Sequence, residues 1–177
     1  VLTLFPFALS ELSKEYIQET ERGRLILSGF MPRLHDKGIR PNRFYRDYFQ
    51  TYVERDVRQL IQVKEQLVFE RFIKLLAGRV GQLLNLDSLA SDVGVSAKTI
   101  RSWVSVLEAS FIVFRLPPYF KNIGKRIVKT PKIYFTEIGL ATYLLGIESP
   151  DQVERDPLFG SLFENMVIAE AYKSRIN

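Results

Sequence analysis

Apolar side chains recur at the spacing of an α-helix in the middle of the chain. From residue 43 they form one stripe at positions i, i+3, i+4, i+7 and i+8, which consists of Tyr45, Tyr48, Phe49, Tyr52 and Val53. Val57, Leu60 and Ile61 prolong the stripe, and charged or polar residues occupy the opposite side. The pattern predicts an amphipathic helix whose aromatic stripe belongs to the core.

The segments on either side of this helix give weaker patterns. Residues 1–5 alternate up to Pro6 in the manner of a strand, and Ser10 is expected to open a short helix that reaches about residue 20. Residues 28–43 are rich in Gly and Pro, which predicts a loop. After the central helix, a second one is predicted from about residue 65 to 80, and Gly81 marks its end. Its inward side carries Val68, Phe72, Leu75 and Leu76.

Residues 85–109 combine the signals of two helices joined by a tight turn. Asn85 or Asp87 can cap a short helix that ends at residue 93. Gly94 supplies the positive φ that the turn requires, and Ser96 can cap the next helix. We therefore predict a helix-turn-helix whose second helix is free to enter a major groove.

The second of these helices has an apolar and a polar face. The buried face is expected to consist of Ile100, Trp103, Val104 and Leu107. The outer face carries Lys98, Thr99, Arg101, Ser102 and Ser105. Because the hydroxyl side chains are short and no Asn or Gln stands among them, this face favours phosphate contacts over the reading of bases.

Two apolar segments after the helix-turn-helix predict a β-hairpin, the wing of a winged helix. They are residues 111–116, which end at two prolines, and residues 132–135. The connection over residues 119–132 holds no acidic residue but five of the 25 cations, namely Lys121, Lys125, Arg126, Lys129 and Lys132. Such a tip beside Lys98 and Arg101 could neutralise several phosphates of double-stranded DNA. The alternatives are a loop that is merely solvated and a winged helix that contacts protein.

The last part of the chain predicts two helices and a connector. A helix is expected over residues 137–145, a connector between Pro150 and Pro157, and a final helix over about residues 162–174. The inward side of the final helix should hold Phe163, Met166, Val167 and Ala171. Glu164 and Glu170 on this helix could bind Mg²⁺ only if further acidic residues joined them. Nothing in the sequence completes that set, so we interpret both as ordinary surface charges.

Composition excludes several classes of protein. The chain has no cysteine, which excludes disulfides and cysteine-based zinc or redox sites and suits a reducing compartment. No apolar run approaches the roughly 18 residues of a membrane span, and the first residues lack the features of a signal peptide. We therefore expect a cytoplasmic protein that does not bind membranes. The net charge of +5 is mild, and the single histidine, His35, has no co-ligand or nucleophile nearby in sequence.

The sequence contains no complete set of catalytic residues. The phosphate-binding pattern Gly-x-x-x-x-Gly-Lys-Ser/Thr is absent, as are Gly-x-Ser-x-Gly and His-Glu-x-x-His. The chain begins with Val1 rather than Met and ends within an amphipathic pattern. We expect a part of a longer polypeptide, without catalytic activity of its own.

Several motifs, in one order along nearly the whole chain, resemble the C-terminal region of prokaryotic AAA+-like P-loop ATPases. They lie at residues 4–12 (Leu-Phe-Pro-Phe-Ala-Leu-Ser-Glu-Leu), 52–57, 81–86, 116–119, 122–125, 132–135 and 162–165. The resemblance implies three parts: residues 1–61 as the last core strand and helical lid of an ATPase, 62–135 as a winged helix, and 136–177 as the truncated start of a nuclease-like α/β domain of unknown function. The expected fold class is thus mainly α with a small β component.

The same resemblance implies further properties. ATP and Mg²⁺ would be cofactors of the full-length parent, whose ATPase core lies upstream in the same polypeptide, and this fragment would hold none. Glu164 corresponds to the acidic residue of the first nuclease-like helix. Arg33 follows Gly-Phe-Met-Pro at residues 29–32, where an acidic residue is expected. Arg33 is therefore either a cofactor-binding cation that senses the nucleotide or a surface change.

The leading functional hypothesis is an ATPase fragment whose winged helix binds DNA or a partner protein. Its candidate DNA-binding residues are Lys98, Thr99, Arg101, Ser102, Lys121, Lys125, Arg126 and Lys129. One alternative is a stand-alone winged-helix transcriptional regulator, and another is a scaffold module that contacts protein. The sequence leaves the oligomeric state open.

Overall fold

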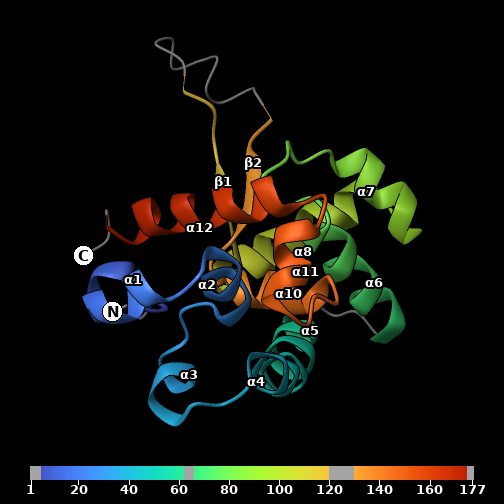
Figure 1. Cartoon of the computed structure of the whole chain (residues 1–177). Helices are drawn as coiled ribbons and strands as arrows, with labels where there is room; N and C mark the ends of the chain where they lie inside the picture. The colour runs from blue at the N-terminus through green and yellow to red at the C-terminus, as the bar shows by residue number, and fades with distance from the viewer. Residues whose placement is uncertain (1–4, 62–65, 120–129, 175–177) are drawn as a thin grey trace.

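The chain is mainly helical with a small β component, as predicted. The computed structural model describes residues 5–61, 66–119 and 130–174, in which helices accompany one two-stranded antiparallel sheet (Figure 1). In these ranges, none of the helices is both long and apolar enough to cross a membrane. The strand predicted over residues 1–5 lies almost wholly outside the described residues.

The elements follow one another in two groups. The first comprises the short 3₁₀-helix η1 (Leu9–Glu11), α1 (Lys14–Glu19), α2 (Arg22–Ser28), α3 (Pro32–Lys37), α4 (Pro41–Tyr48), the π-helix η2 (Phe49–Val57), α5 (Arg58–Ile61) and α6 (Gln66–Ala77). The second comprises α7 (Leu86–Val93), α8 (Ala97–Ala109), β1 (Val113–Leu116), β2 (Lys132–Phe135), α10 (Ile138–Leu144), α11 (Pro150–Arg155) and α12 (Phe159–Lys173).

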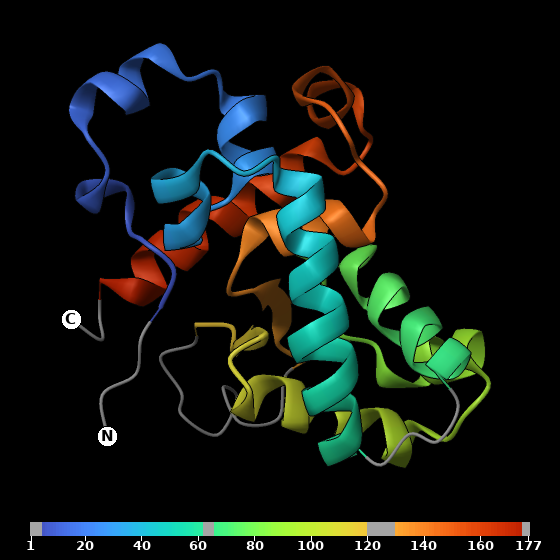
Figure 2. The same ribbon diagram turned by 90° about the horizontal axis from the view of Figure 1, so that it is seen from below.

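The helices α4, η2 and α5 form one continuous rod over residues 41–61, which Figure 2 shows through the middle of the molecule. Its buried residues, Tyr45, Phe49, Val53 and Val57, confirm most of the predicted aromatic stripe. These four residues are spaced by four. A step of four overshoots one turn of an α-helix and falls short of one turn of a π-helix, so the two kinds of turn together keep these residues on one side of the rod. The prediction that Leu60 prolongs the stripe is wrong, since this side chain is 67% exposed. The side chain of Ile61 lies outside the described part.

The loop predicted over residues 28–43 is interrupted by a helix. Pro32 and Pro41 occupy the first positions of α3 and α4, where a missing N–H costs no hydrogen bond. The prolines therefore begin helices here, and Gly38, with φ of +58°, ends α3. The first helix, α1, begins later than predicted, because the hydroxyl of Ser13 accepts a hydrogen bond from the Tyr16 N–H at 3.1 Å.

The helix α6 confirms the second predicted helix but ends three residues earlier, at Ala77. Its buried side holds Phe69, Phe72, Ile73 and Leu76, whereas Val68 and Leu75 are only half-buried. The inward side was thus predicted correctly only in part. Gly81, with φ of +72°, lies in the turn that follows.

The C-terminal part departs from the prediction in two places. The expected connector contains α11, which begins at Pro150. The Ser149 hydroxyl caps this helix by accepting a hydrogen bond from the Gln152 N–H.

In α12 the buried residues are Leu162, Asn165, Met166, Ala169 and Lys173. Of the four residues predicted to face inward, only Met166 does so; Phe163, Val167 and Ala171 are exposed. The amide of buried Asn165 bonds the backbone N–H and C=O of Phe135 in β2, at 2.7 and 2.9 Å, and this pairing fixes the orientation of α12.

The main hydrophobic core of the described residues runs from Leu25 in α2 to Met166 in α12, and a smaller cluster consists of Phe114, Tyr134 and Ala169. The main core crosses the predicted boundaries at residues 61/62 and 135/136, and the division into three parts stays a prediction. The helices α2, α4, α6 and α12 all contact α10, whose residues are almost entirely buried. The short helix α10 is therefore the centre on which the N-terminal and C-terminal elements meet.

A buried carboxylate, Glu137, caps this central helix. Its Oε1 accepts hydrogen bonds from the Gly139 N–H at 3.0 Å and the Phe30 N–H at 3.1 Å, and the Tyr45 hydroxyl donates to it at 3.0 Å. Glu137 and Tyr45 can lie this close to the backbone because the neighbouring residues, Gly29 and Gly139, have no side chain. A Cβ at Gly29 would lie 1.9 Å from Oε1 of Glu137, and one at Gly139 would lie 2.4 Å from the ring of Tyr45. The carboxylate thus joins α10 to the start of the α2–α3 connection and to the rod.

The carboxyl of Glu137 should make the stability of the fold depend on pH. Burial raises its pKa, against the hydrogen bonds from Gly139 and Phe30, the charge of Lys173 and the hydrogen bond from Tyr45. Between the ordinary Glu pKa of about 4.3 and this raised value, the folded state binds more protons than the unfolded state. The contribution of Glu137 to the unfolding free energy is therefore largest in acid and falls as pH rises through that window.

We predict that the difference in unfolding free energy between wild type and Glu137→Gln decreases as pH rises across this window, because glutamine does not titrate. Urea unfolding at a series of pH values measures it. The variant Glu15→Gln, at an exposed position of α1, controls for the loss of one acidic residue. A difference that instead increases with pH would mean that the hydrogen bonds and Lys173 outweigh burial.

Candidate nucleic-acid interface

The helix-turn-helix segment is built from local backbone interactions that the sequence predicts. The Asn85 side chain caps α7 by accepting from the Ser88 N–H at 2.9 Å, so Asn85 rather than Asp87 is the cap. Gly94 ends α7 with φ of +85°, and Ser96 caps α8 by accepting from the Thr99 N–H at 3.1 Å. The helices α7 and α8 are therefore joined by a turn of three residues.

The inner face of α8 is the predicted one. Ile100, Val104 and Leu107 are at most 1% exposed, and Trp103 is 7% exposed. The indole of Trp103 packs edge-on against Phe72 of α6, with ring centroids 5.2 Å apart. This packing fixes the rotation of α8 about its own axis, and so decides which residues it presents to solvent.

The outer face of α8 presents two cations and two serines. Lys98, Arg101, Ser102 and Ser105 are all exposed, at positions i, i+3, i+4 and i+7. Within the described ranges, neither Lys98 nor Arg101 takes part in an ion pair. The one acidic residue of α8, Glu108, bonds the guanidinium of Arg115 in β1 at 2.6 Å. Among the residues that the structure describes, no carboxylate pairs with the positive charge of this face.

Thr99 differs from the other predicted contact residues. It is half-buried, and its hydroxyl lies 2.7 Å from the hydroxyl of Ser96. Both groups serve the cap at the start of α8. Thr99 is thus part of the cap that begins α8. The candidate DNA-binding residues that α8 exposes to solvent are Lys98, Arg101 and Ser102.

The hairpin after α8 has the predicted strands in antiparallel register, with Val113 opposite Phe135 and Leu116 opposite Lys132. Residues 81–84, between α6 and α7, bond the other side of β2: the Gly81 N–H donates to the Ile133 carbonyl at 2.9 Å. The predicted contact residues Lys121, Lys125, Arg126 and Lys129 lie outside the described residues, so their place beside α8 stays a prediction.

The two glutamates of α12 connect elements of the fold. Glu164 bonds the Lys132 ammonium at 2.7 Å and also accepts from the Tyr134 hydroxyl, and these bonds lower its pKa. Glu170 accepts from the Leu9 N–H at 2.7 Å and from the buried ammonium of Lys173 at 2.5 Å. Glu164 is therefore a surface carboxylate that forms an ion pair, whereas the interpretation of Glu170 as an ordinary surface charge is wrong, because it bonds a buried ammonium. Among the residues that the structure describes, no group of acidic or histidine side chains could hold a metal ion.

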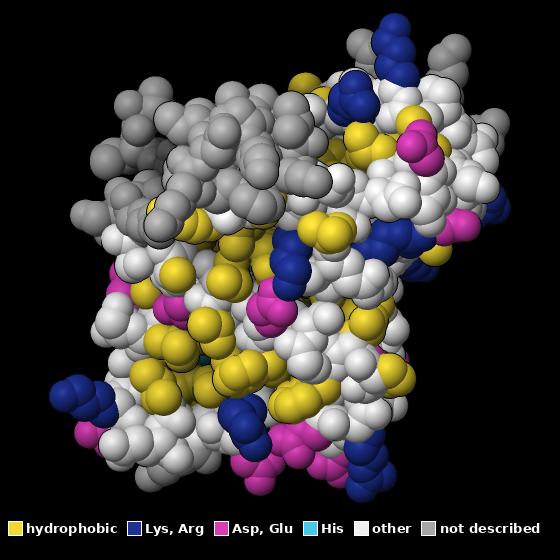
Figure 3. Space-filling model, turned by 90° about the horizontal axis from the view of Figure 1, so that it is seen from above, with side chains coloured by type: hydrophobic (Ala, Val, Ile, Leu, Met, Phe, Trp, Pro, Cys, Tyr) yellow, Lys and Arg dark blue, Asp and Glu magenta, His cyan; other side chains and the backbone are white. Residues whose placement is uncertain are grey.

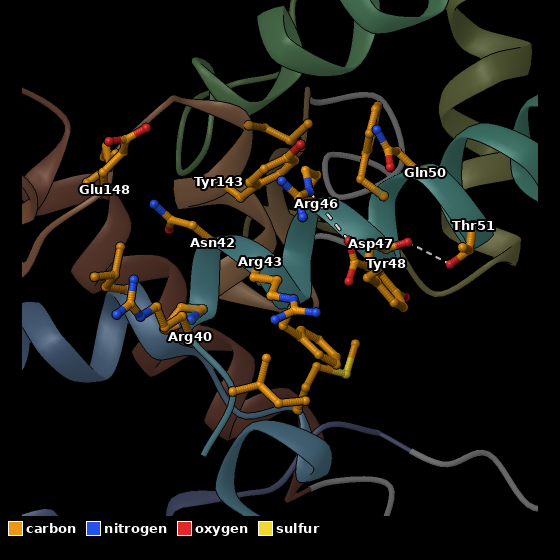
Figure 4. Close-up of a pocket in the computed structure, with 18 of the residues that line it drawn as sticks. Arg40, Asn42, Arg43, Arg46, Asp47, Tyr48, Gln50, Thr51, Tyr143 and Glu148 are labelled. Carbon is orange, nitrogen blue, oxygen red and sulfur yellow. Dashed lines mark hydrogen bonds and ion pairs between the residues drawn. The ribbon is translucent and has the colours of Figure 1, made fainter. Parts of the chain in front are cut away.

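Arg33 lies on α3 at the wall of a groove of about 2000 Å³ between the rod, α6 and the segment after α10. Arg40, Arg43 and Arg46 line the same groove, which Figure 4 shows with several of its side chains. The sequence patterns did not single out these three arginines. Their spacing of three would have placed them near one another on a helix, but the opposite wall comes from residues about 100 positions away. His35, which is not among the residues that line the groove, is half-buried between Phe7 and Tyr16, with Nε2 3.2 Å from the Gly29 carbonyl.

Comparisons with known proteins place the chain among uncharacterized relatives. Residues 20–151 match the family described as Domain of unknown function (DUF8612). Uncharacterized proteins of Mycobacterium tuberculosis and Mycobacterium bovis are each 33% identical over 164 residues, which is 92% of this chain. An uncharacterized protein of Methanocaldococcus jannaschii is 27% identical over 136 residues, or 74% of this chain. The chain spans 37% of the length of the mycobacterial relatives and 27% of the archaeal one. No solved structure matches it.

The variant Trp103→Ala should lower the unfolding free energy by about 3–5 kcal/mol, because it leaves a cavity between α6 and α8. Chemical denaturation of both proteins measures this difference. The variant Ser102→Ala, at an exposed neighbouring position, should change it by less than about 0.5 kcal/mol. A loss below about 1 kcal/mol for Trp103→Ala would contradict the packing that orients α8.

Proposed function

The chain belongs to the family of the Domain of unknown function (DUF8612), and we propose that it is the C-terminal part of a prokaryotic AAA+-like P-loop ATPase that binds double-stranded DNA. In this proposal α7, α8 and the hairpin act as a winged helix-turn-helix. The observation that carries the DNA-binding part is the outer face of α8, where Lys98 and Arg101 are exposed without an ion pair among the described residues.

The dimensions of α8 suit a major groove. Its 13 residues span about 20 Å at 1.5 Å per residue, and the groove is about 12 Å wide. Where such a helix enters the groove at an angle, only part of it can lie between the phosphate backbones. Lys98 lies in the first turn and Arg101 one turn later, so both cations are near the end that a helix-turn-helix directs at DNA. Ser102 and Ser105 are short, which lets the backbone of α8 approach the groove closely.

The ATPase part of the proposal rests on the motif resemblance along the chain and on the greater length of the relatives. The phosphate-binding segments, with ATP and Mg²⁺, would belong to a core upstream of these residues in the same polypeptide. The 177 residues would then hydrolyse nothing by themselves. We further propose a cytoplasmic protein, in keeping with the absence of cysteine from the sequence.

A protein partner is the second candidate function, and exposed apolar residues favour it. Leu83, Leu116 and Tyr119 lie at or beside the hairpin and are 60%, 36% and 79% exposed. Phe163 and Val167 add apolar area on α12, and Figure 3 shows hydrophobic side chains gathered on the side of the molecule where α12 lies. A scaffold module would use such surfaces and would need no cations on α8.

We predict that the double variant Lys98→Glu with Arg101→Glu weakens binding to a DNA duplex by at least about tenfold at low salt. Each phosphate contact contributes about 0.9 to the slope of log affinity against log salt, so the slope should also shrink by about 2. Fluorescence anisotropy of a labelled duplex at several salt concentrations measures both quantities.

The matched control is Arg22→Glu with Arg155→Glu, which makes the same charge change at exposed positions of α2 and α11. This control should keep most of the affinity. Equal losses in both double variants would indicate attraction by net charge alone. Duplex binding without any dependence on salt, or no duplex binding at all, would instead favour the scaffold.

A further inference from the structure

We propose that the groove along the start of the rod binds a segment of single-stranded nucleic acid. This groove lies between α3, the rod, α6 and the segment that joins α10 to α11, and Figure 4 looks into it. The proposal does not depend on α8, and it rests on the charge, the aromatic lining and the size of the groove.

The charge comes from arginines that are close in sequence. Arg33 in α3, Arg40 before α4 and Arg43 in α4 all line the groove and are exposed. Among the described residues, none of these three arginines forms an ion pair. A guanidinium in this state can bind a phosphate through two parallel hydrogen bonds, which a carboxylate partner would otherwise occupy.

The acidic residues of the groove leave this end positive. Asp47 forms an ion pair with Arg46 at 3.4 Å and Glu70 with Lys74 at 3.6 Å, so each of these carboxylates has a cation beside it. Glu54 lies further along the rod, beyond the three free arginines. Glu148, in the segment after α10, is the other carboxylate of the lining, and Figure 4 shows it toward the same end of the groove as Arg40. With these two ion pairs set aside, the lining keeps three cations, Arg33, Arg40 and Arg43, against two carboxylates, Glu54 and Glu148.

Aromatic rings alternate with these arginines. Phe44 and Tyr48 follow Arg43 and Asp47 in sequence and both line the groove, with stacked rings whose planes differ by 12°. Tyr143 reaches it from α10 and lies beside Arg46 in Figure 4. Half-buried rings next to cations are how proteins bind unpaired bases: the rings stack on the bases while the cations follow the backbone.

The size of the groove indicates a chain-like ligand. Pockets for small molecules usually measure about 300–1,000 Å³, and this groove has about 2000 Å³. A single metabolite would leave much of it empty. In a duplex the bases are paired and stacked on one another, whereas the bases of a single strand can stack on aromatic rings. An acidic peptide would satisfy the arginines but would make little use of Phe44, Tyr48 and Tyr143, so we favour nucleic acid.

The test compares two charge-reversal variants on two ligands. A labelled oligothymidylate of about 15 nucleotides serves as the single strand, since this covers the upper range of known site sizes, and a duplex of equal length serves as the second ligand. The variant Arg40→Glu with Arg43→Glu should weaken binding of the single strand by at least about tenfold and change duplex affinity by less than about threefold. The variant Lys98→Glu with Arg101→Glu should do the reverse.

Four outcomes would overturn the proposal. These are no binding of the single strand by wild type, an unchanged affinity in Arg40→Glu with Arg43→Glu, equal affinity for an oligothymidylate of about three nucleotides, and displacement by polyglutamate as efficient as by unlabelled oligothymidylate. The third outcome would indicate a small ligand and the fourth an acidic peptide. Circular dichroism and the thermal unfolding midpoint verify that the variants fold. A loss of duplex binding alone would contradict the function proposed for α8 and leave the groove proposal standing.

Discussion

The carboxylate of Glu137 is the contact on which the arrangement of the helices depends. It is 3% exposed, and its hydrogen bonds reach the connection after α2, the rod and the start of α10. An unpaired carboxylate at this depth would be very costly, so the three donors must be in place whenever the core is closed. Gly29 and Gly139 have no Cβ where one would collide with this cluster. Lys173 lies close enough to oppose the effect of burial on the Glu137 pKa, and its own ammonium bonds the Phe7 carbonyl at 2.7 Å, so the network extends to both ends of the described chain.

The local signals of the sequence predicted the elements whose ends are set by their own residues. Asn85, Gly94 and Ser96 act on the backbone within three or four positions of themselves, so the helix-turn-helix could be read directly. The rotation of α12 about its axis could not be predicted in this way, because apolar residues occur all around the helix. Its orientation is decided by Asn165, a polar side chain that pairs with the backbone of β2 30 residues earlier. The loop predicted before α4 failed for a different reason. Proline disfavours the interior of a helix and suits its first turn, so Pro32 and Pro41 were compatible with either interpretation.

The candidate surfaces also contain some residues that local sequence could identify and others whose position depends on distant parts of the chain. Lys98 and Arg101 could be chosen from the sequence because Trp103 and its apolar neighbours define the inner face of one helix. Thr99 looked equivalent to them, yet its hydroxyl bonds Ser96, a contact that depends on the cap geometry. The groove arginines were missed because a concavity needs two walls. The second wall includes Tyr143 and Glu148, whose position follows from the docking of α10 against the rod and α6.

The rod relates these two surfaces to each other. Its first helix lines the groove, and its last helix, α5, packs against α8, as Figure 2 shows. The 21 residues of the rod span about 30 Å, so charges at its two ends are further apart than the screening length of about 8 Å at physiological salt. A change of charge at one surface should therefore act on the other only through the rod itself. Since Tyr45 joins the rod to the Glu137 cluster and Val53 and Val57 are buried in the core, the rod has little freedom to bend or turn. Ligands at its two ends should consequently bind independently, unless a partner that disturbs the Glu137 cluster moves the rod as a whole.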